Sequence, residues 1–203
     1  MIICLVTDRR RADPIAQAHH AVEAGIDLIQ IRERDLEAAA LAALTRAVAG
    51  IARGSATRVV VNDRVDVAIA CGVDGVHLRA DSVAADAVRR LAPNGFLVGR
   101  SIHAAAEAEE AGPVDYLVAG TAFPSASKAE SAAWLGETGL RAIVQSVRTP
   151  VIAIGGIATE NVDAVARAGA AGVAAIGLFA VDGPLVATVR ALRARFDRAK
   201  SHP

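Results

Sequence analysis

Short apolar runs rich in Val, Ile and Leu alternate along the chain with Ala-rich segments of helical period. The apolar runs are continuous, which is typical of strands buried on both faces of a parallel sheet. Eight strands are predicted, at residues 3–7, 27–32, 58–62, 75–78, 96–101, 115–120, 151–156 and 173–177. Eight helices are predicted at residues 14–24, 36–53, 64–71, 84–91, 104–111, 138–147, 161–168 and 184–199.

A short motif recurs at the borders of these units. It reads A-G-I-D at residues 24–27, C-G-V-D-G at 71–75, A-G-P-V-D at 111–115 and A-G-A-A-G at 168–172, and each copy places a helix-ending glycine before a strand. This regular repeat favours a closed eightfold barrel over an open doubly wound sheet, and no G-x-G-x-x-G follows the first strand. Residues 1–203 are therefore expected to form an α/β fold, a single-domain (β/α)8 TIM barrel.

Composition narrows the classes of partner. The 22 basic and 22 acidic residues cancel, so the overall charge favours neither nucleic acid nor an anionic membrane, and any anion must be held locally. No apolar run approaches the roughly 20 residues that span a bilayer, and the N-terminal MIICLVTDRR lacks the order of a signal peptide. We therefore expect a cytoplasmic protein with small-molecule partners, no nucleic acid and no membrane, and the sequence leaves a homo-oligomer open.

Polar residues follow almost every predicted strand, where a barrel of this kind gathers its chemistry. They are Thr7 and Asp8; Gln30, Arg32 and Arg34; Asn62, Asp63 and Arg64; His77; Arg100, Ser101 and His103; Thr121, Ser125, Ser127 and Lys128. Two further strands end in glycine, with Gly155 and Gly156 after one and Ile176 and Gly177 at the other, so their bare N–H groups could hold a phosphate. Single residues of these types are as often ordinary rim or core residues, and their shared location indicates a site.

The segment IQIRER places Gln30, Arg32 and Arg34 on one face of an extended chain. Two guanidinium groups beside a lysine suit a pyrophosphate or a phosphate ester, because the arginine fork matches phosphate oxygens. Asp63 and Asp8 are the nearest candidates for a hard divalent ion, since magnesium commonly takes one or two carboxylates with phosphate and water. They could equally act as caps or as partners of nearby arginines, Arg64 and Arg9.

These motifs resemble a known family when they are taken in order. The chain carries T-D, Q-x-R-x-R, N-D-R-V-D-V-A, D-G-V-H-L, G-R-S-I-H, D-Y-x-x-x-G-T-x-F-P-S-x-S-K, A-I-G-G-I and A-A-I-G. Together they resemble the thiamin phosphate synthase and thiazole tautomerase superfamily over nearly the whole chain, and that superfamily has the barrel fold. The synthase joins hydroxymethylpyrimidine pyrophosphate to a thiazole phosphate and releases pyrophosphate through a pyrimidine cation. The tautomerase isomerises the carboxythiazole phosphate that feeds this step.

The resemblance implies a role for each matching residue. Pyrophosphate contacts fall on Gln30, Arg32, Arg34, Asn62, Ser101 and Lys128, with a magnesium ligand at Asp63. The thiazole phosphate would be held by backbone N–H groups around Gly155, Gly156, Ile176 and Gly177, with Ser125 and Ser127 on the loop that covers the substrate. His77 joins the substrate-binding set, and the catalytic set is Arg32, Arg34, Ser101, Lys128 and His103.

The sequence also departs from the synthase pattern. Synthases usually continue after G-V-H-L with G-Q-E-D, whose aspartate is the second magnesium ligand. This chain has R-A-D-S, so Ser82 stands there and Asp81, one place earlier, is the expected partner of Asp63. His103 matches a histidine of the tautomerase, but the other tautomerase histidine is Thr121 here, and Lys128 is a synthase trait. We favour the synthase, with the tautomerase or a non-catalytic thiamin-phosphate binder as alternatives.

Overall fold

The computed structural model describes residues 1–124, 134–181 and 183–201. In this part of the chain, eight parallel strands pair in sequence order, and β8 pairs with β1 to close the barrel. The strands are β1 (Ile2–Val6), β2 (Leu28–Ile31), β3 (Arg58–Asn62), β4 (Gly75–Leu78), β5 (Leu97–Ile102), β6 (Tyr116–Gly120), β7 (Val151–Ile154) and β8 (Gly172–Ala175). The predicted TIM barrel is confirmed.

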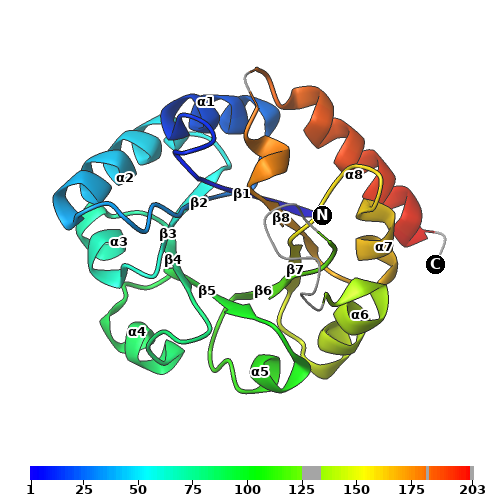
Figure 1. Cartoon of the computed structure of the whole chain (residues 1–203). Coiled ribbons are helices and arrows are strands. Elements are labelled where there is room, and N and C mark those ends of the chain that lie inside the picture. The colour runs from blue at the N-terminus through cyan, green and yellow to red at the C-terminus, as the bar shows by residue number, and fades with distance from the viewer. Residues whose placement is uncertain (125–133, 182, 202–203) are drawn as a thin grey trace.

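Helices follow the strands and form a ring outside the barrel (Figure 1). They are α1 (Pro14–Ala24), α2 (Ala38–Ala52), α3 (Val65–Cys71), α4 (Ala85–Leu91), α5 (Ala105–Glu109), α6 (Gly136–Ser146), α7 (Val162–Arg167) and α8 (Val186–Ser201). A short 3-10 helix, η1 (Gly177–Phe179), follows β8 and was not predicted. No helix in the described ranges is long and apolar enough to cross a membrane.

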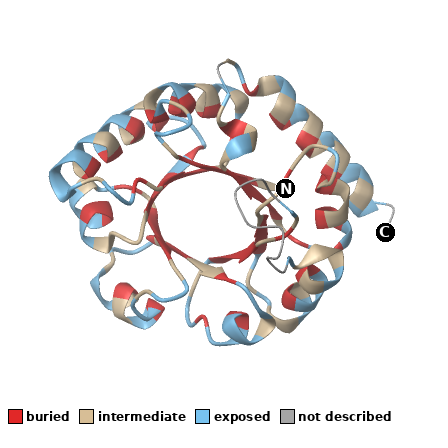
Figure 2. Cartoon of the chain, in the orientation of Figure 1, coloured by how far each residue is buried: buried red, intermediate tan, exposed pale blue. Residues whose placement is uncertain are grey.

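The core has two layers because successive strand residues point to opposite faces. On β1, Ile3 and Leu5 join the large cluster between the sheet and the helices, while Cys4 and Val6 join a smaller cluster inside the barrel. Figure 2 shows the strands as a largely buried ring and the buried residues of the helices turned towards it. The barrel interior is thus a packed core, and chemistry is confined to its ends.

The recurrent A-G motif ends helices as predicted. Gly25, Gly72, Gly112 and Gly169 follow α1, α3, α5 and α7, and all four have left-handed φ angles, between 62° and 86°. A side chain at Cβ disfavours that conformation, so glycine is the residue that lets each helix stop and the chain turn into the next strand.

The aspartate of the same motif clamps neighbouring strands together. In three copies its backbone N–H donates to a carbonyl of the preceding strand, and its carboxylate accepts the N–H of that same residue at 2.7 Å. The pairs are Asp27 with Ile3, Asp74 with Val59, and Asp115 with Val98. The fourth copy has Ala171, which keeps the backbone bond, to the carbonyl of Val151. These clamps lie at the N-terminal end of the barrel, opposite the predicted site.

Candidate active site

Gln30 and Asn62 meet where β2 and β3 end. The amide nitrogen of Gln30, Nε2, donates to Oδ1 of Asn62 at 3.0 Å, and Gln30 is buried. The bond orients both amides across two neighbouring strands. The sequence predicted that these two residues converge, and the structure brings them together.

A buried carboxylate that the sequence analysis did not single out fixes the start of the arginine segment. Glu33 is buried, accepts a hydrogen bond from Thr7 Oγ1 at 2.6 Å and also accepts the backbone N–H of Arg9 at 3.1 Å. Thr7 Oγ1 in turn accepts the backbone N–H of Arg32 at 3.0 Å. Glu33 therefore ties the loop after β1 to the loop after β2.

Arg32 and Arg34 are the chain neighbours of Glu33, so this network of hydrogen bonds holds their backbone in place. Strand β2 ends at Ile31, so Arg34 lies in a turn beyond it and the extended segment is shorter than predicted. Burial and then the positive charge of Arg34 lower the pKa of Arg32, while Asp8 and Glu33 oppose the shift. Arginine stays charged in proteins all the same, so the two repelling cations favour a bound anion.

Asp63 stands at the end of β3 with a left-handed φ of 61°, a conformation that aspartate tolerates better than most residues. Its backbone N–H donates to the carbonyl of His77 at 2.8 Å, and its carboxylate accepts a short hydrogen bond from the hydroxyl of Ser82. Arg79 Nη1 lies 3.6 Å from the same carboxylate, and Arg79 Nη2 lies 2.5 Å from Asp81 Oδ2. The two predicted metal ligands thus share one guanidinium.

The arginine partners differ from those predicted. Asp63 pairs with Arg79, while Arg64 pairs with Asp66 at 2.6 Å. Asp8 pairs with Arg11 at 3.4 Å and accepts the backbone N–H of Arg10, so it caps its own loop. Asp63 remains the better metal candidate because it shares Arg79 with Asp81, the second proposed ligand, whereas Asp8 bonds within its own loop.

The oxygen donors around Asp63 are of the chemical type that binds magnesium. Two carboxylates and the hydroxyl of Ser82 are hard ligands, and magnesium is usually held by one or two carboxylates together with substrate phosphate and water. Among the described residues, no group of three or more His, Cys, Asp or Glu side chains could hold a metal alone. The donor set fits an ion shared with a bound pyrophosphate.

His77 lies beneath Ser101 inside the barrel. Its side chain is 2% exposed, its Nε2 lies 2.8 Å from Ser101 Oγ, and its ring stacks on Tyr116. Burial lowers the pKa of His77 to about 4, so the ring is neutral near pH 7. In this position His77 orients the hydroxyl of Ser101, and the predicted roles of both residues towards a ligand stay predictions.

His103 follows β5, and its ring Nδ1 lies 2.5 Å from the carbonyl oxygen of Gly120. Because a carbonyl oxygen only accepts, Nδ1 carries the proton in this contact. The backbone N–H of His103 donates to Glu107 at 2.8 Å, which holds the residue at the mouth of the barrel.

The two glycine-ended strands are neighbours, because Ile154 of β7 pairs with Ala174 of β8. Gly155 and Gly156 have φ angles of 97° and 63°, and a Cβ on Gly156 would lie 2.4 Å from the carbonyl oxygen of Pro124. Only glycine fits there. Asn161 closes the loop by donating to the carbonyl of Gly156 at 2.7 Å. This loop and the residues Ile176 and Gly177 thus follow two neighbouring strands, and their role in binding a phosphate stays a prediction.

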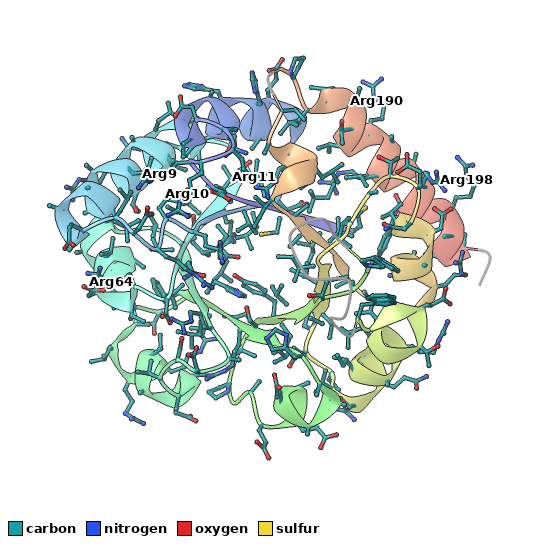
Figure 3. All side chains as sticks on the ribbon, in the orientation of Figure 1. Arg9, Arg10, Arg11, Arg64, Arg190 and Arg198 are labelled. Carbon is teal, nitrogen blue, oxygen red and sulfur yellow. The ribbon has the colours of Figure 1, made fainter. Side chains whose placement is uncertain are left out.

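Arg11 was not among the predicted site residues. Its Nη1 lies 3.8 Å from where a Cβ on Gly177 would stand, and Figure 3 shows Arg11 beside η1, while Arg190 and Arg198 lie out on α8. The run D-R-R-R after the first strand was the available signal. Arg11 therefore adds a positive charge next to the predicted thiazole phosphate pocket, at Gly177.

Ser125, Ser127 and Lys128 lie outside the described residues. The flanks of their segment are described and meet at the mouth. Leu135 N–H donates to the carbonyl of Thr121, and Gly136 N–H donates to that of Ala122, both at 2.9 Å. The roles of the two serines and of the lysine stay predictions.

A parallel barrel with arginines, carboxylates and glycine loops gathered at its C-terminal mouth defines a TIM-barrel enzyme of phosphorylated small molecules. Residues 3–179 match the family described as thiamine monophosphate synthase. The chain belongs to this family.

Named relatives extend over most of the chain. A thiamine-phosphate synthase of Methanoregula boonei is 40% identical over 185 residues, which is 90% of this chain and 86% of the relative. One from Anaeromyxobacter dehalogenans is 42% identical over 167 residues, covering 81% and 75%. The solved thiamine phosphate pyrophosphorylase from Pyrococcus furiosus has 31% identity, a TM-score of 0.87 and coverage of 98% and 96%. These likenesses favour the synthase over the tautomerase.

Proposed function

We propose that this chain is a thiamin-phosphate synthase that joins hydroxymethylpyrimidine pyrophosphate to a thiazole phosphate and releases pyrophosphate. The observation that carries the proposal is a cluster of cations at the C-terminal strand ends, where the charges of Arg34 and Arg79 act on Arg32 and Arg79 pairs with Asp63. Gln30 and Asn62 bond to each other at the same end of the barrel. Relatives about 40% identical that are named for this activity support it. The proposed location is the cytoplasm.

The cationic pocket suits a dissociative displacement. As the bond to the pyrimidine carbon breaks, negative charge grows on the leaving pyrophosphate and positive charge grows on the pyrimidine. Arg32, Arg34 and Ser101, with Lys128 from the adjoining segment, bind that leaving group. Fixed charges aimed at developing charge stabilise the transition state more than the ground state. The thiazole nitrogen then attacks the carbon, so no nucleophilic side chain is needed.

Asp63 and Asp81 are the proposed magnesium ligands. When bound, magnesium supplies further positive charge to the pyrophosphate oxygens. Ser82 and the backbone bond to His77 orient Asp63 for that task. On the opposite side of the mouth, backbone N–H groups around Gly155, Gly156, Ile176 and Gly177 hold the thiazole phosphate in this proposal. Arg11 lies beside Gly177.

The test is an assay of the purified protein with the substrates of both candidate activities, with and without magnesium. We expect magnesium-dependent pyrophosphate release, and Arg32→Met should lower its rate at least about a hundredfold, the scale of losing one preorganised charge contact. Asp63→Ala and Lys128→Ala should do the same.

The matched control is Arg10→Met, which removes a charge from an exposed pair with Asp35 at the same end of the barrel. Its rate should stay within about twofold of the wild type, because exposed ion pairs contribute little. Unchanged release in Arg32→Met, or isomerisation of carboxythiazole phosphate without pyrophosphate release, would contradict the proposal.

A further inference from the structure

Arg79 holds both predicted metal ligands at once. Its guanidinium lies 3.6 Å from Asp63 Oδ2 and 2.5 Å from Asp81 Oδ2, and its positive charge also helps to lower the pKa of Arg32. The side chain of Arg79 is 41% exposed and that of Asp63 is 31% exposed. Arg79 therefore pairs with both carboxylates and lies close enough to Arg32 for the two positive charges to interact.

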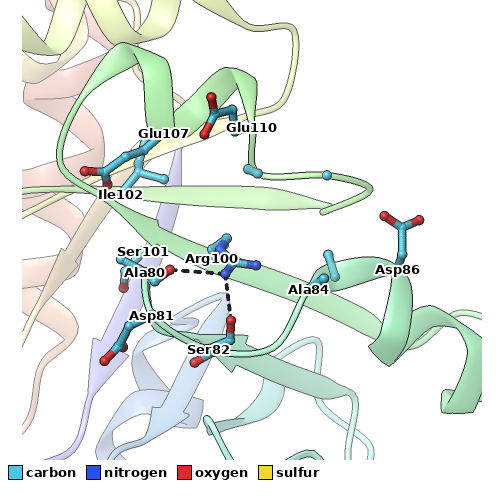
Figure 4. Close-up of a pocket in the computed structure, with 13 residues that line it drawn as sticks. Ala80, Asp81, Ser82, Ala84, Asp86, Arg100, Ser101, Ile102, Glu107 and Glu110 are labelled. Carbon is cyan, nitrogen blue, oxygen red and sulfur yellow. Dashed lines mark hydrogen bonds between the residues drawn. The ribbon is translucent and has the colours of Figure 1, made fainter.

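The turn that carries Arg79 has a fixed backbone. Arg79 N–H donates to Ser82 Oγ at 2.9 Å, and Ser82 N–H donates to the carbonyl of Arg79 at 3.3 Å, which closes the turn. Arg100 of β5 then donates to the carbonyls of Ala80 and Ser82 at 3.2 and 3.1 Å (Figure 4). It also reaches the carbonyl of Val83 at 3.2 Å. The side chain of Arg79 therefore extends from a turn whose backbone is held by these hydrogen bonds.

Ser82 completes the arrangement. It accepts the N–H of Arg79 and donates to the carboxylate of Asp63, so one hydroxyl links the arginine turn to the metal candidate. A divalent cation that took oxygens from Asp63 and Asp81 would meet the positive charge of Arg79 at close range. Arginine cannot lose that charge in a protein, so the guanidinium must move aside.

We propose that Arg79 is a tethered competitor of the divalent cation. It pairs with Asp63 and Asp81 when no metal is bound, and so raises the metal concentration at which the site fills. The inference rests on the proposed magnesium role of Asp63. Since partly exposed ion pairs are individually weak, the expected effect is moderate, about three- to tenfold in the metal dissociation constant.

The experiment measures Mn²⁺ binding by electron paramagnetic resonance in the presence of inorganic pyrophosphate, and so needs no turnover. Arg79→Met removes the charge, keeps an unbranched apolar stem and adds no oxygen ligand, and we expect it to tighten Mn²⁺ binding three- to tenfold. Arg79→Lys keeps a charge at this place and should stay close to the wild type. Arg10→Met is the control for loss of one positive charge at the same mouth, and should also stay close.

Several results would overturn the competition. The first is that Arg79→Met binds Mn²⁺ no more tightly than the wild type does. The second is that Arg79→Lys or Arg10→Met tightens Mn²⁺ binding as much as Arg79→Met does. Circular dichroism and thermal unfolding establish that each variant is folded. If neither the wild type nor Arg79→Met binds Mn²⁺, the inference and the role of Asp63 as a metal ligand both fall. The proposed synthase activity would still be judged separately, by pyrophosphate release.

Discussion

His77 is a neutral histidine enclosed in the barrel, between Ser101 and Tyr116. Its pKa is about 4 in the folded chain, against about 6.5 for an ordinary histidine in an unfolded one. The unfolded chain therefore takes up this proton first as the pH falls. We expect the free energy of unfolding to decrease between pH 6.5 and pH 4 for this reason.

The measurement is urea unfolding across that pH range for the wild type and for His77→Phe, which keeps a ring against Tyr116 but cannot titrate. Carboxylates contribute to acid unfolding in both proteins, so the informative quantity is the difference between the two slopes. The wild type should lose stability more steeply between pH 6.5 and 4. Parallel curves would show that His77 does not carry the effect.

The chemical types at the strand ends could be predicted because a parallel barrel brings those ends together. The Gln30–Asn62 pair follows from strand order, whereas Arg32 and Arg34 lie beyond the end of β2, where strand alternation no longer applies. Glu33 could not be predicted, because its partner Thr7 is 26 residues away and an acid between arginines looks like a solvated surface residue. Arg79 was missed since its reach to Asp63 depends on the conformation of a turn.

At the scale of elements, the strands were predicted to within a residue or two at most ends. Strands β3 and β4 and helix α1 begin and end at the predicted residues, while β5 is shifted by one residue. The apolar pattern marks where a buried strand lies, but the ends depend on pairing with neighbours that the pattern does not describe. The recurrent A-G motif is informative because its glycine ends a helix and its aspartate, where present, forms hydrogen bonds with the preceding strand.

The loop after β7 depends on glycine for a steric reason. A Cβ on Gly156 would stand 2.4 Å from the Pro124 carbonyl oxygen and 2.5 Å from that of Phe123, so Gly156→Ala must displace the loop. We expect this variant to raise the KM for thiazole phosphate at least about tenfold, because small displacements of a binding backbone are costly. Steady-state kinetics with each substrate varied in turn gives the measurement.

Gly54→Ala is the matched control for this change. Gly54 also has a positive φ, 79°, but a Cβ there would meet nothing within 4 Å. The control therefore suffers the backbone strain, roughly 1–2 kcal/mol, without the collision, and its KM should equal that of the wild type. An equal rise in both variants would point to general destabilisation rather than to the phosphate loop.

In the whole molecule, the N-terminal end of the barrel carries stabilising contacts, while the C-terminal mouth carries the proposed site. At the N-terminal end, Arg193 of α8 donates to the carbonyls of Met1 and Gly25 at 2.8 Å and to Asp27 at 2.9 Å. It thereby joins the last helix to the start of β1 and to the clamp before β2. At the C-terminal mouth, Arg32 and Arg34 repel each other, so the site is a source of strain that a bound anion relieves.

This division predicts opposite outcomes for two arginine substitutions. Arg193→Met should lower stability by about 2 kcal/mol, a fall in Tm of roughly 4–8 °C for a chain of this size, and leave pyrophosphate release at 25 °C unchanged. Arg32→Met should lower the rate of release at least about a hundredfold, while its Tm stays equal to that of the wild type or rises, because a repelled and partly buried cation is removed. Calorimetry and the release assay on the same preparations compare the two. A loss of activity in Arg193→Met at a temperature where it is folded would show that the ends are coupled, and a fall in Tm for Arg32→Met would show that its charge stabilises the mouth.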